Sequence, residues 1–552
     1  MNQSKSYRSQ LLNLLSRAYN ITIQTKGKER SHTEQVCEIY QHHSEQRRKF
    51  ISNMAKAGIA VGAAGILNSC KKITDFVPGQ PSDTGGVSNK KNQPAIVIVG
   101  AGIAGLNCAY QLQQRGYDSA VYEGSSRISG RIFTKTDILA PGLYTELGGE
   151  FIDSNHKDII NLCTEFNLNL LDTGTQAESA YVRDSFYIDG RFYTEDEVIT
   201  AFHPYAARIK ADIKSLPGVM TYDDHDAITE YFDSMSIKAY LDSIGMSGFI
   251  RKGIETAYLT EYGLETDVQS SINFLFLFSA NTANGFHIFG SSDERYKIEG
   301  GNQSLTRALY AQVKNSVNLE HKLVKITQTN NGYILYFMNA NGSTISVNAD
   351  IIIAAIPFTL LREIELDVPL PPWKKNAINN LGYGINSKLL LGFNNRVWRN
   401  YQHSGYVFTN EVIQTGWDNS WIQPGAAGGY TIYQGGNKGL ALGNGTPQSQ
   451  APQFIQQMQA MWPGCGAAFN GNVKRMHWPD YPFTKGSYAS YKVGQYTTIR
   501  GAEIKNIGNL YFAGEHCSAN FQGFMNGAAE TGRIAAKTII QSIKAGNNIL
   551  IS

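Results

Sequence analysis

The chain has 552 residues, 42% of them hydrophobic and 17% charged, and its 49 Lys and Arg against 46 Asp and Glu leave a formal net charge of +3. This length exceeds what one hydrophobic core usually serves, so we expect two intertwined domains, and the near balance of charge gives no electrostatic reason to expect nucleic acid as a partner. The six cysteines lie apart without CxxC pairs, so we predict neither a metal site nor a disulfide framework: Cys37, Cys70, Cys108, Cys163, Cys465 and Cys517.

The first 70 residues are typical of an export signal. Arg47 and Arg48 precede an Ala/Gly-rich run at 55–66 that is too short and too weakly apolar to cross a bilayer. This pattern predicts a twin-arginine signal, and the alternative is a surface helix that carries two arginines. The long polar stretch 1–45 departs from the usual signal and is consistent with a start site that the cell does not use.

A lipid anchor is a second expectation for this region. Residues 67–70 read Leu-Asn-Ser-Cys and resemble a lipoprotein processing box with Cys70 as the lipidated residue, although Asn68 stands where a smaller or aliphatic residue is usual. Residues 71–93 are rich in Lys, Gly, Pro, Ser and Asp, which predicts a flexible linker. No later segment offers about 20 consecutive apolar residues. We therefore expect an exported protein that is periplasmic or anchored to the membrane through lipid.

A glycine-rich loop follows the apolar strand predicted at 95–99. Its glycines let the backbone turn tightly and approach a pyrophosphate, and the helix predicted over 103–115 aims its N-terminal amides at that charge. A second strand at 119–122 leads to an acid about 20 residues on, where a carboxylate hydrogen-bonds ribose hydroxyls and disfavours a 2′-phosphate. This complete unit predicts a dinucleotide site formed by Gly100, Gly102, Ile103, Ala104, Gly105 and Glu123.

Two further segments stand where a cofactor longer than NAD would continue: SSRISGR at 125–131 and TELGGEFID at 145–153. Here the sequence resembles the flavin-containing amine oxidase family, which includes monoamine, polyamine and L-amino-acid oxidases, and the resemblance extends over 94–540. It implies an α/β fold with a Rossmann-like FAD-binding domain and a substrate domain of mixed sheet and helices. We assign 94–169, 291–356 and 500–545 to the FAD-binding domain, and 170–290 and 357–499 to the substrate domain.

The resemblance also implies that the dinucleotide is a resident FAD. Residues 509–533 match the family's second flavin segment, which a dissociable NAD would not need. Monoamine oxidases attach FAD through a cysteine just before the cage tyrosine, and this chain has Ser487 there, so we expect noncovalent binding. Besides the glycine loop, the expected FAD contacts are Gly130, Arg131, Gly148, Gly149, Glu150, Val324, Gly514, Glu515, Gly523, Phe524 and Met525.

The resemblance places the chemistry on four side chains. Lys388 matches the lysine that the family binds through a water to flavin N5, where desolvation would lower its pKa. Trp478 matches a tryptophan near that lysine. Tyr488 and Phe524 match the two walls of an aromatic cage that steers an amine towards N5. From the residues alone, a solvated strand lysine and ordinary aromatic packing are the alternatives.

The substrate class depends on fewer residues. Amino-acid oxidases of the family tend to carry an arginine after the ELG-like motif for the substrate carboxylate, whereas this chain has Glu150 and Asp153. Acids there are typical of amine and polyamine oxidases, in which they attract a distal ammonium, and capping of the next helix is the alternative. A carboxylate could still be bound by an arginine from the variable region 170–290: Arg183, Arg191 or Arg251.

We therefore predict an FAD-dependent oxidase that transfers a hydride from an amine to flavin N5 and passes the electrons to O2, giving an imine or aldehyde, ammonia or amine, and H2O2. An L-amino-acid oxidase or a tryptophan 2-monooxygenase-like enzyme is the alternative. A carotenoid-type desaturase and a noncatalytic flavoprotein are further alternatives, against which Lys388 and the Tyr488/Phe524 pair argue. The sequence leaves the oligomeric state open, a dimer included.

Overall fold

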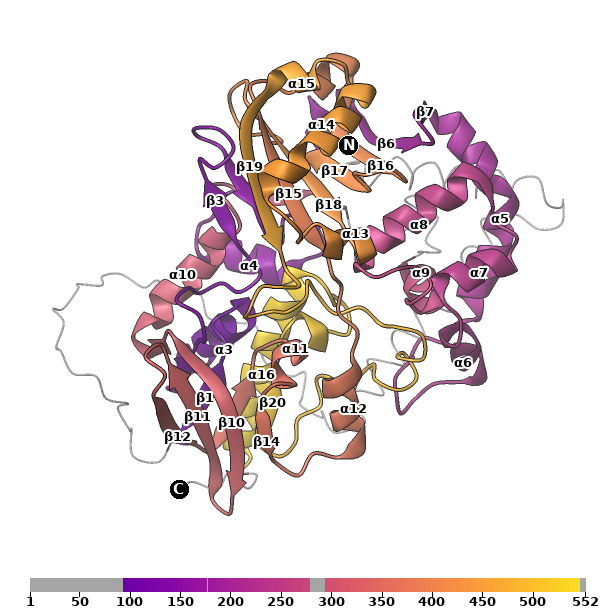
Figure 1. Cartoon of the computed structure of the whole chain (residues 1–552). Helices are drawn as coiled ribbons and strands as arrows, with labels where there is room; N and C mark the ends of the chain where they lie inside the picture. The colour runs from indigo at the N-terminus through magenta and orange to yellow at the C-terminus, as the bar shows by residue number, and fades with distance from the viewer. Residues whose placement is uncertain (1–92, 176, 278–292, 547–552) are drawn as a thin grey trace, which may run out of the picture. The chain divides into compact units, whose positions relative to one another are not determined.

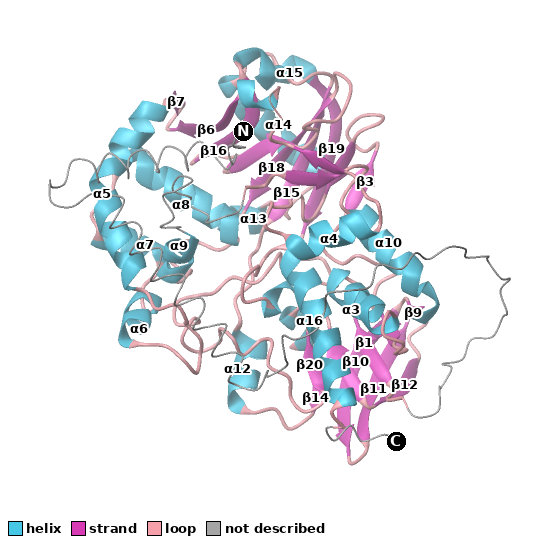
Figure 2. Ribbon diagram, turned by 180° about the vertical axis from the view of Figure 1, so that it is seen from behind, coloured by secondary structure: helices cyan, strands magenta, loops and turns pink. Residues whose placement is uncertain are grey.

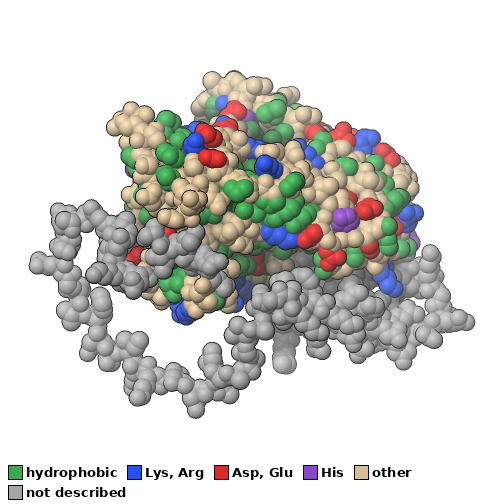
Figure 3. Space-filling view, turned by 90° about the horizontal axis from the view of Figure 1, so that it is seen from below, with side chains coloured by type: hydrophobic (Ala, Val, Ile, Leu, Met, Phe, Trp, Pro, Cys, Tyr) green, Lys and Arg blue, Asp and Glu red, His purple; other side chains and the backbone are tan. Residues whose placement is uncertain are grey.

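The computed structural model describes residues 93–552, apart from 176, 278–292 and 547–552. The twin-arginine pattern, Cys70 and nearly all of the linker therefore lie outside the described residues. Within those residues, no helix combines the length and the apolar character needed to cross a membrane. Figure 3 shows acidic and basic side chains interspersed over one face, as the near balance of charge predicts.

A five-stranded parallel sheet carries the glycine loop. Its strands run in the order β20 (Leu510–Phe512), β13 (Ile351–Ala354), β1 (Ile96–Val99), β2 (Ala120–Tyr122) and β9 (Val317–Asn318). β1, β13 and β20 are apolar and buried along their whole length, as is typical of a parallel sheet that is covered on both faces. Helices α3 (Ile103–Gln113), α10 (Gln303–Val313) and α16 (Met525–Lys544) pack together beside it (Figures 1 and 2).

A second sheet has four strands. Its order is β12 (Thr344–Ala349), β11 (Gly332–Asn339), β10 (His321–Thr329) and β14 (Glu365–Asp367), and only β14 pairs in parallel. The register between β10 and β11 shifts between Leu323 and Lys325, which leaves Val324 outside the ladder as a β-bulge. β14 comes from beyond residue 356, where we placed the domain boundary.

A seven-stranded mixed sheet forms the other large layer. Its order is β19 (Phe469–His477), β15 (Ser387–Phe393), β18 (Gly428–Gln434), β17 (Thr415–Asp418), β16 (His403–Thr409), β6 (Val182–Ile188) and β7 (Arg191–Tyr193). Every residue of β15 is buried, and Lys388 stands opposite Tyr433 of β18 and Met476 of β19. A charged side chain in so buried a strand requires partners.

Five helices cluster beside this sheet (Figures 1 and 2): α5 (Glu195–Ser215), α6 (Ala227–Asp233), α7 (Ile237–Ser243), α8 (Gly248–Tyr262) and α9 (Ser271–Leu277). α5 begins with a capping box between Thr194 and Glu197. α8 ends at Gly263, whose φ of 73° favours glycine.

The remaining elements connect these layers. They are helices α4 (Lys157–Glu165), α11 (Phe358–Leu361), α12 (Pro372–Asn380), α13 (Gly436–Ala441), α14 (Pro447–Met461) and α15 (Cys465–Ala468), and the strand pairs β3 (Thr134–Thr136) with β4 (Tyr144–Glu146) and β5 (Leu170–Asp172) with β8 (Tyr296–Ile298).

Helices α3 and α16 approach each other most closely at Gly532. A Cβ atom there would lie 2.2 Å from the carbonyl oxygen of Ala104. We therefore expect Gly532→Ala to lower the free energy of unfolding by about 1–3 kcal/mol, measured by denaturant unfolding, because the added methyl overpacks the contact. Lys537→Ala, at an exposed position of the same helix, is the control and should change stability by less than about 0.5 kcal/mol. Equal stability of the two variants would contradict the close approach.

Candidate active site

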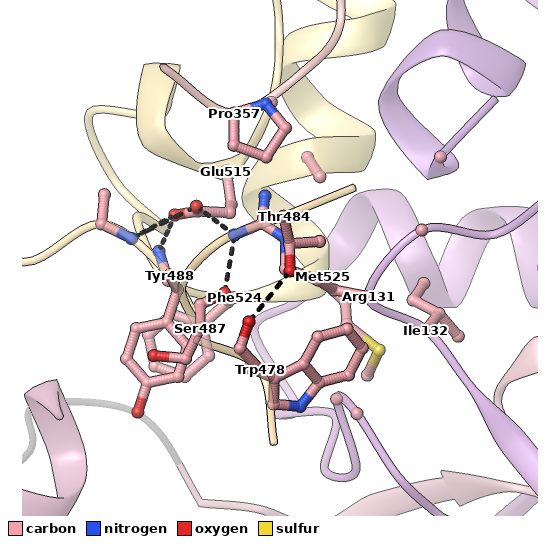
Figure 4. Close-up of a pocket in the computed structure, with 18 of the residues that line it drawn as sticks. Arg131, Ile132, Pro357, Trp478, Thr484, Ser487, Tyr488, Glu515, Phe524 and Met525 are labelled. Atoms are coloured by element: carbon pink, nitrogen blue, oxygen red, sulfur yellow. Dashed lines mark hydrogen bonds and ion pairs between the residues drawn. The ribbon is translucent and has the colours of Figure 1, made fainter. Parts of the chain in front are cut away.

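Residues from all three large sheets line a cavity of about 500 Å³. Every site residue predicted from the sequence lines this cavity except Gly105, which lies behind the glycine loop. Figure 4 shows one part of the lining, in which dashed lines join Arg131, Ser487 and Glu515. Trp478 lies on one side of this group, and the rings of Tyr488 and Phe524 lie on the other. The chain therefore brings segments from both ends of the described sequence to one site.

The glycine loop has the geometry that a pyrophosphate requires. Gly100 has a φ of 106°, and a Cβ on Gly105 would lie 1.9 Å from the carbonyl oxygen of Gly100. A Cβ on Gly102 would meet no atom within 4 Å, so this position opens into the cavity at the start of α3. α3 has no side-chain cap, and its first amides remain available to an anion.

The acid after β2 is held in place by the loop itself. Glu123 accepts hydrogen bonds from the Ala101 amide at 2.8 Å and from the Ser125 amide at 2.9 Å, one at each carboxylate oxygen. Oε1 also accepts from the Ser125 hydroxyl at 2.9 Å, whereas Oε2 keeps a further lone pair for a ribose hydroxyl. Val324 also lines the cavity, and the β-bulge there leaves its backbone groups outside the ladder between β10 and β11. An adenine edge could form hydrogen bonds with these groups.

An ion pair joins the segment 509–533 to the segment 125–131. Nη1 of Arg131 lies 2.7 Å from Oε1 of Glu515 and donates to the Ser487 carbonyl at 2.8 Å (Figure 4). Oε2 of Glu515 accepts from the Gly523 amide at 2.8 Å, just before α16 begins. The contact fixes the start of α16 against the 130–132 turn.

The loop after β4 is closely packed. A Cβ on Gly148 would lie 1.9 Å from the Arg131 carbonyl oxygen, and a Cβ on Gly149 would lie 2.8 Å from the side chain of Met525. Glycine at both positions lets this loop pass between the segment 125–131 and the segment 509–533.

Lys388 is buried and fully engaged with protein atoms. Its Nζ donates to the carbonyl oxygens of Glu146 at 3.1 Å and Gly148 at 2.9 Å, and to Oε2 of Glu150 at 3.0 Å. Only 4% of the residue is exposed. The sequence did not reveal the carboxylate partner, and the hydrogen bond to a water that the resemblance implies stays a prediction.

Glu150 has two lysine partners that the sequence did not reveal. Its Oε1 lies 3.0 Å from Nζ of Lys297 and its Oε2 lies 3.0 Å from Nζ of Lys388, and its expected role as a contact for a distal substrate ammonium stays a prediction. Burial opposes ionisation of Glu150, but the two lysines outweigh it and lower its pKa. Burial likewise opposes the charge of Lys297, and the Glu150 carboxylate outweighs it and raises the pKa of Lys297.

Asp153 also has a structural partner. It accepts from the Glu294 amide at 2.8 Å, and its other oxygen lies 3.4 Å from the His156 ring. Sequence reasoning missed Lys297, because nothing local to residues 295–299 indicates a carboxylate partner in another segment.

Trp478 lies against the same loop as Lys388. Its indole N–H donates to the Leu147 carbonyl at 3.2 Å, and its ring edge would lie 3.2 Å from a Cβ on Gly148. The tryptophan and the lysine thus meet through residues 147 and 148, as the resemblance implies.

The aromatic wall contains a second tyrosine that the sequence did not reveal. The hydroxyls of Tyr488 and Tyr433 lie 2.9 Å apart, and Tyr488 donates to the Glu261 carbonyl at 2.6 Å. Burial raises the pKa of Tyr488 well above its usual value, so its hydroxyl stays protonated. Phe524 stands at the first turn of α16, in edge contact with His156 at 5.1 Å.

The ring of Trp417 also lies beside Lys388. The Trp417 ring centroid is 5.2 Å from Nζ of Lys388, and Trp417 is in edge contact with Tyr433. The signal that could have identified Tyr433 and Trp417 is the pairing of β18 with β15 and of β17 with β18, which the sequence does not specify.

Two of the three arginines predicted as alternatives, Arg191 and Arg251, do not line the cavity. Arg191 pairs with Glu197 on the surface, and Arg251 pairs with Asp242 and Glu255; the Arg183 side chain lies outside the described residues.

Arg500 does line the cavity, and no motif in the sequence identified it. It donates to the Met220 carbonyl at 2.7 Å and lies over the rings of Phe276 and Tyr496. Among the residues that the structure describes, no carboxylate lies within ion-pair distance of Arg500.

Comparison with known proteins places the chain among flavoenzymes. A family model described as flavin containing amine oxidoreductase matches residues 103–540. An L-amino-acid oxidase of Demansia vestigiata is 24% identical over 88% of this chain and 94% of its own length. An L-amino acid dehydrogenase of a Synechocystis species is 22% identical over 80% of this chain and 94% of its own length. A solved putrescine oxidase bound to putrescine shares the fold, with a TM-score of 0.69 and 20% identity over 81% of this chain and 99% of that one.

Glu146 gives the site a pH-dependent stability. Burial raises the pKa of Glu146 to about 7, although the Asn302 amide favours its charged form. Since the folded-state pKa exceeds the unfolded value, the contribution of this group is complete at low pH and is lost as the pH rises through 7. We expect the wild type to lose on the order of 3 kcal/mol relative to Glu146→Gln between pH 4.5 and 8, measured by unfolding at each pH.

Glu320→Gln, which alters an exposed acid, should retain the wild-type pH dependence. Parallel stability curves for the wild type and Glu146→Gln would contradict a protonated Glu146.

Proposed function

Because the chain belongs to the family of flavin-containing amine oxidoreductases, we propose that it is an FAD-dependent oxidase of a small amine, with O2 as the electron acceptor. FAD, when bound, supplies N5 as the hydride acceptor and transfers the two electrons to O2, which leaves as H2O2. The products from the substrate are an imine, which hydrolyses to an aldehyde, and ammonia or a shorter amine.

The residues around the cavity fit FAD rather than a shorter cofactor. The open position at Gly102 and the free amides of α3 suit the pyrophosphate, and Glu123 suits a ribose. The Arg131–Glu515 pair and the start of α16 line the opposite part of the cavity, where the ribityl chain and the flavin ring would lie. Ser487 donates to Asn386 and offers no thiol, which supports noncovalent binding.

The observation that carries the proposal is the placement of Lys388, Trp478, Tyr488 and Phe524 in the same cavity as both flavin segments. The hydroxyl bonds of Tyr488 to Tyr433 and Glu261 fix the orientation of its ring. Fixed aromatic faces exclude water, orient the amine and tolerate its partial positive charge. These faces are therefore contacts for the reacting amine.

Arg500 favours an L-amino acid as the second candidate substrate. Its guanidinium reaches the cavity without a carboxylate partner among the described residues, so it can bind a substrate carboxylate. A relative that is named an L-amino-acid oxidase supports this candidate, and the putrescine oxidase supports the first.

Export remains part of the proposal. The twin-arginine pattern at 47–48 supports export, and the box ending at Cys70 supports a lipid anchor. A route for folded proteins would let FAD bind before the chain leaves the cytoplasm.

The first test is an anaerobic absorbance titration of the purified protein with monoamines, polyamines and L-amino acids in separate series. Bleaching of the flavin band by amines, followed by H2O2 release on admission of air, is the expected result. Acid precipitation should release all of the FAD into the supernatant, since no thiol is available at position 487. A flavin that no substrate in the three series bleaches would contradict the proposed enzyme, and a flavin retained in the pellet would contradict noncovalent binding.

Arg500→Met separates the two substrate classes. If the substrate carries a carboxylate, losing this charge-assisted contact should raise KM by about tenfold or more with little change in kcat. If the substrate is a simple amine, KM should change less than about twofold. Steady-state peroxide assays with the best amine and the best amino acid measure the difference, and Arg251→Met, which removes a surface ion pair, is the control.

A further inference from the structure

We propose that Gln522 binds the reacting nitrogen of the substrate, by accepting a hydrogen bond from its N–H at the side-chain oxygen Oε1, and that Tyr491 and Glu503 are positioning residues that fix this orientation of the amide. The inference rests on the proposed function, because it concerns the amine that the cavity receives. It applies to a simple amine and to the amino group of an amino acid, since both carry N–H groups on the nitrogen that is oxidised.

Gln522 lies beside the aromatic pair. It lines the cavity two residues before Phe524, and a Cβ atom on Gly523 would lie 3.5 Å from the ring of Tyr488. The backbone is held in place here, because the Gly523 amide donates to Oε2 of Glu515 at 2.8 Å. The side chain at position 522 therefore starts next to the rings that orient the amine in the proposed function.

Two acceptors determine which end of the Gln522 amide faces the protein. Nε2 donates to the Tyr491 hydroxyl at 3.0 Å and to the His516 carbonyl oxygen at 3.3 Å. A carbonyl oxygen can only accept, so the nitrogen and not the oxygen must face His516. The two N–H groups of Nε2 are thus both used. Among the residues that the structure describes, no donor contacts Oε1, so this oxygen remains for a ligand in the cavity.

Glu503 sets the direction of the Tyr491 hydroxyl. Oε1 of Glu503 accepts from that hydroxyl at 2.6 Å, and only 2% of Glu503 is exposed. Burial raises the pKa of Tyr491 well above its usual value, so the hydroxyl keeps the proton that it donates. Because this proton is directed at Glu503, a lone pair of the hydroxyl oxygen is left to accept from Gln522. The donors therefore run in one direction, from Gln522 through Tyr491 to Glu503.

The neighbours of Glu503 leave its carboxyl group to Tyr491. Nζ of Lys374 donates to the Glu503 carbonyl oxygen at 2.9 Å, and the thiol of Cys517 lies 3.6 Å from the same oxygen, so both contact the backbone of Glu503. Burial raises the pKa of the Glu503 carboxyl group to about 7. At pH 8.5 this group is ionised, and a carboxylate is the stronger acceptor for the Tyr491 hydroxyl.

A fixed acceptor beside the aromatic pair assists the oxidation in two ways. It orients the nitrogen through one of its N–H groups. As the carbon loses a hydride to the cofactor, the lone pair of the nitrogen forms the C=N bond, and the N–H groups of the resulting iminium ion gain positive charge. A carbonyl oxygen that already faces an N–H stabilises this charge without reorganisation. Loss of the contact should therefore lower kcat as well as raise KM.

The test compares ligands that have an N–H with ligands that lack one. Benzylamine, putrescine and L-phenylalanine are assayed with the flavin-loaded full chain at pH 8.5. Their fully N-methylated analogues serve as competitive inhibitors, because a quaternary nitrogen has neither an N–H nor a lone pair for oxidation. We expect Gln522→Met, which removes the acceptor and nearly keeps the side-chain length, to lower kcat/KM for the best substrate about tenfold or more.

The inhibition constant of the quaternary analogue should change less than about twofold in the same variant, since this ligand makes no hydrogen bond that Gln522→Met could remove. An equal loss for both ligands would show a displaced cavity wall and would overturn the contact. Unchanged kcat/KM would overturn it as well.

A matched pair of variants tests the positioning residues. Glu503→Gln keeps a carbonyl oxygen for the Tyr491 hydroxyl, whereas Glu503→Met removes it. We expect kcat/KM within about twofold of the wild type for Glu503→Gln, and a loss of about threefold or more for Glu503→Met and for Tyr491→Phe. Equal activity of the two Glu503 variants would overturn the positioning role. These variants leave Gln522 in place, so they also decide the question if Gln522→Met does not fold.

Binding without turnover separates this test from that of the proposed function. The anaerobic change in flavin absorbance gives a dissociation constant for each ligand even where no oxidation follows. Amines that bind to the wild type without being oxidised would contradict the proposed function, and a selective loss of their affinity in Gln522→Met would still support the contact. Equal oxidation by the wild type and Gln522→Met would overturn the contact and leave the proposed function supported. A wild type that binds none of the three amines would overturn both.

Discussion

The carboxylate of Glu150 is shared by two buried lysines, and the arrangement of the cavity depends on this contact. Glu150 follows β4, Lys297 lies in β8 and Lys388 lies in the seven-stranded sheet, so the cluster joins segments that no continuous sheet connects. Each unpaired charge would cost several kcal/mol in this buried setting. The three side chains therefore require one another, and the loop that carries the flavin-facing glycines is held to β15 in a single position.

The conformation of short backbone motifs explains which parts of the fold and of the cavity could be predicted from the sequence. The glycine loop, Glu123 and the start of α16 follow from short motifs whose φ values and amide directions are set by neighbouring residues. Lys297 and Tyr433 could not be predicted in this way, because their roles arise from partners far along the chain. Glu150 and Lys297 are 147 residues apart, and Tyr433 meets Lys388 only through the register of β15 against β18.

The buried ion cluster and Arg500 belong to different parts of the cavity lining. Near Lys388, hydrogen bonds and ion pairs join the charged groups to one another, and the rings of Trp417, Tyr433 and Tyr488 line the cavity beside them. Arg500 lies among other residues, between Phe276 and Tyr496. Arg500 therefore has contacts that are separate from those of the Glu150 cluster.

The parallel sheet has a consequence for the order of events during synthesis. β1 and the glycine loop leave the ribosome early, but β13 pairs with β1 only later, and β20 and α16 come from the end of the chain. Until β13 has been synthesised, one edge of the entirely apolar strand β1 stays unpaired. Such an edge can bind chaperones or pair with other chains and aggregate. The flavin pocket is closed only by the last helix. A yellow colour therefore reports that a molecule has been translated to its last helix and folded.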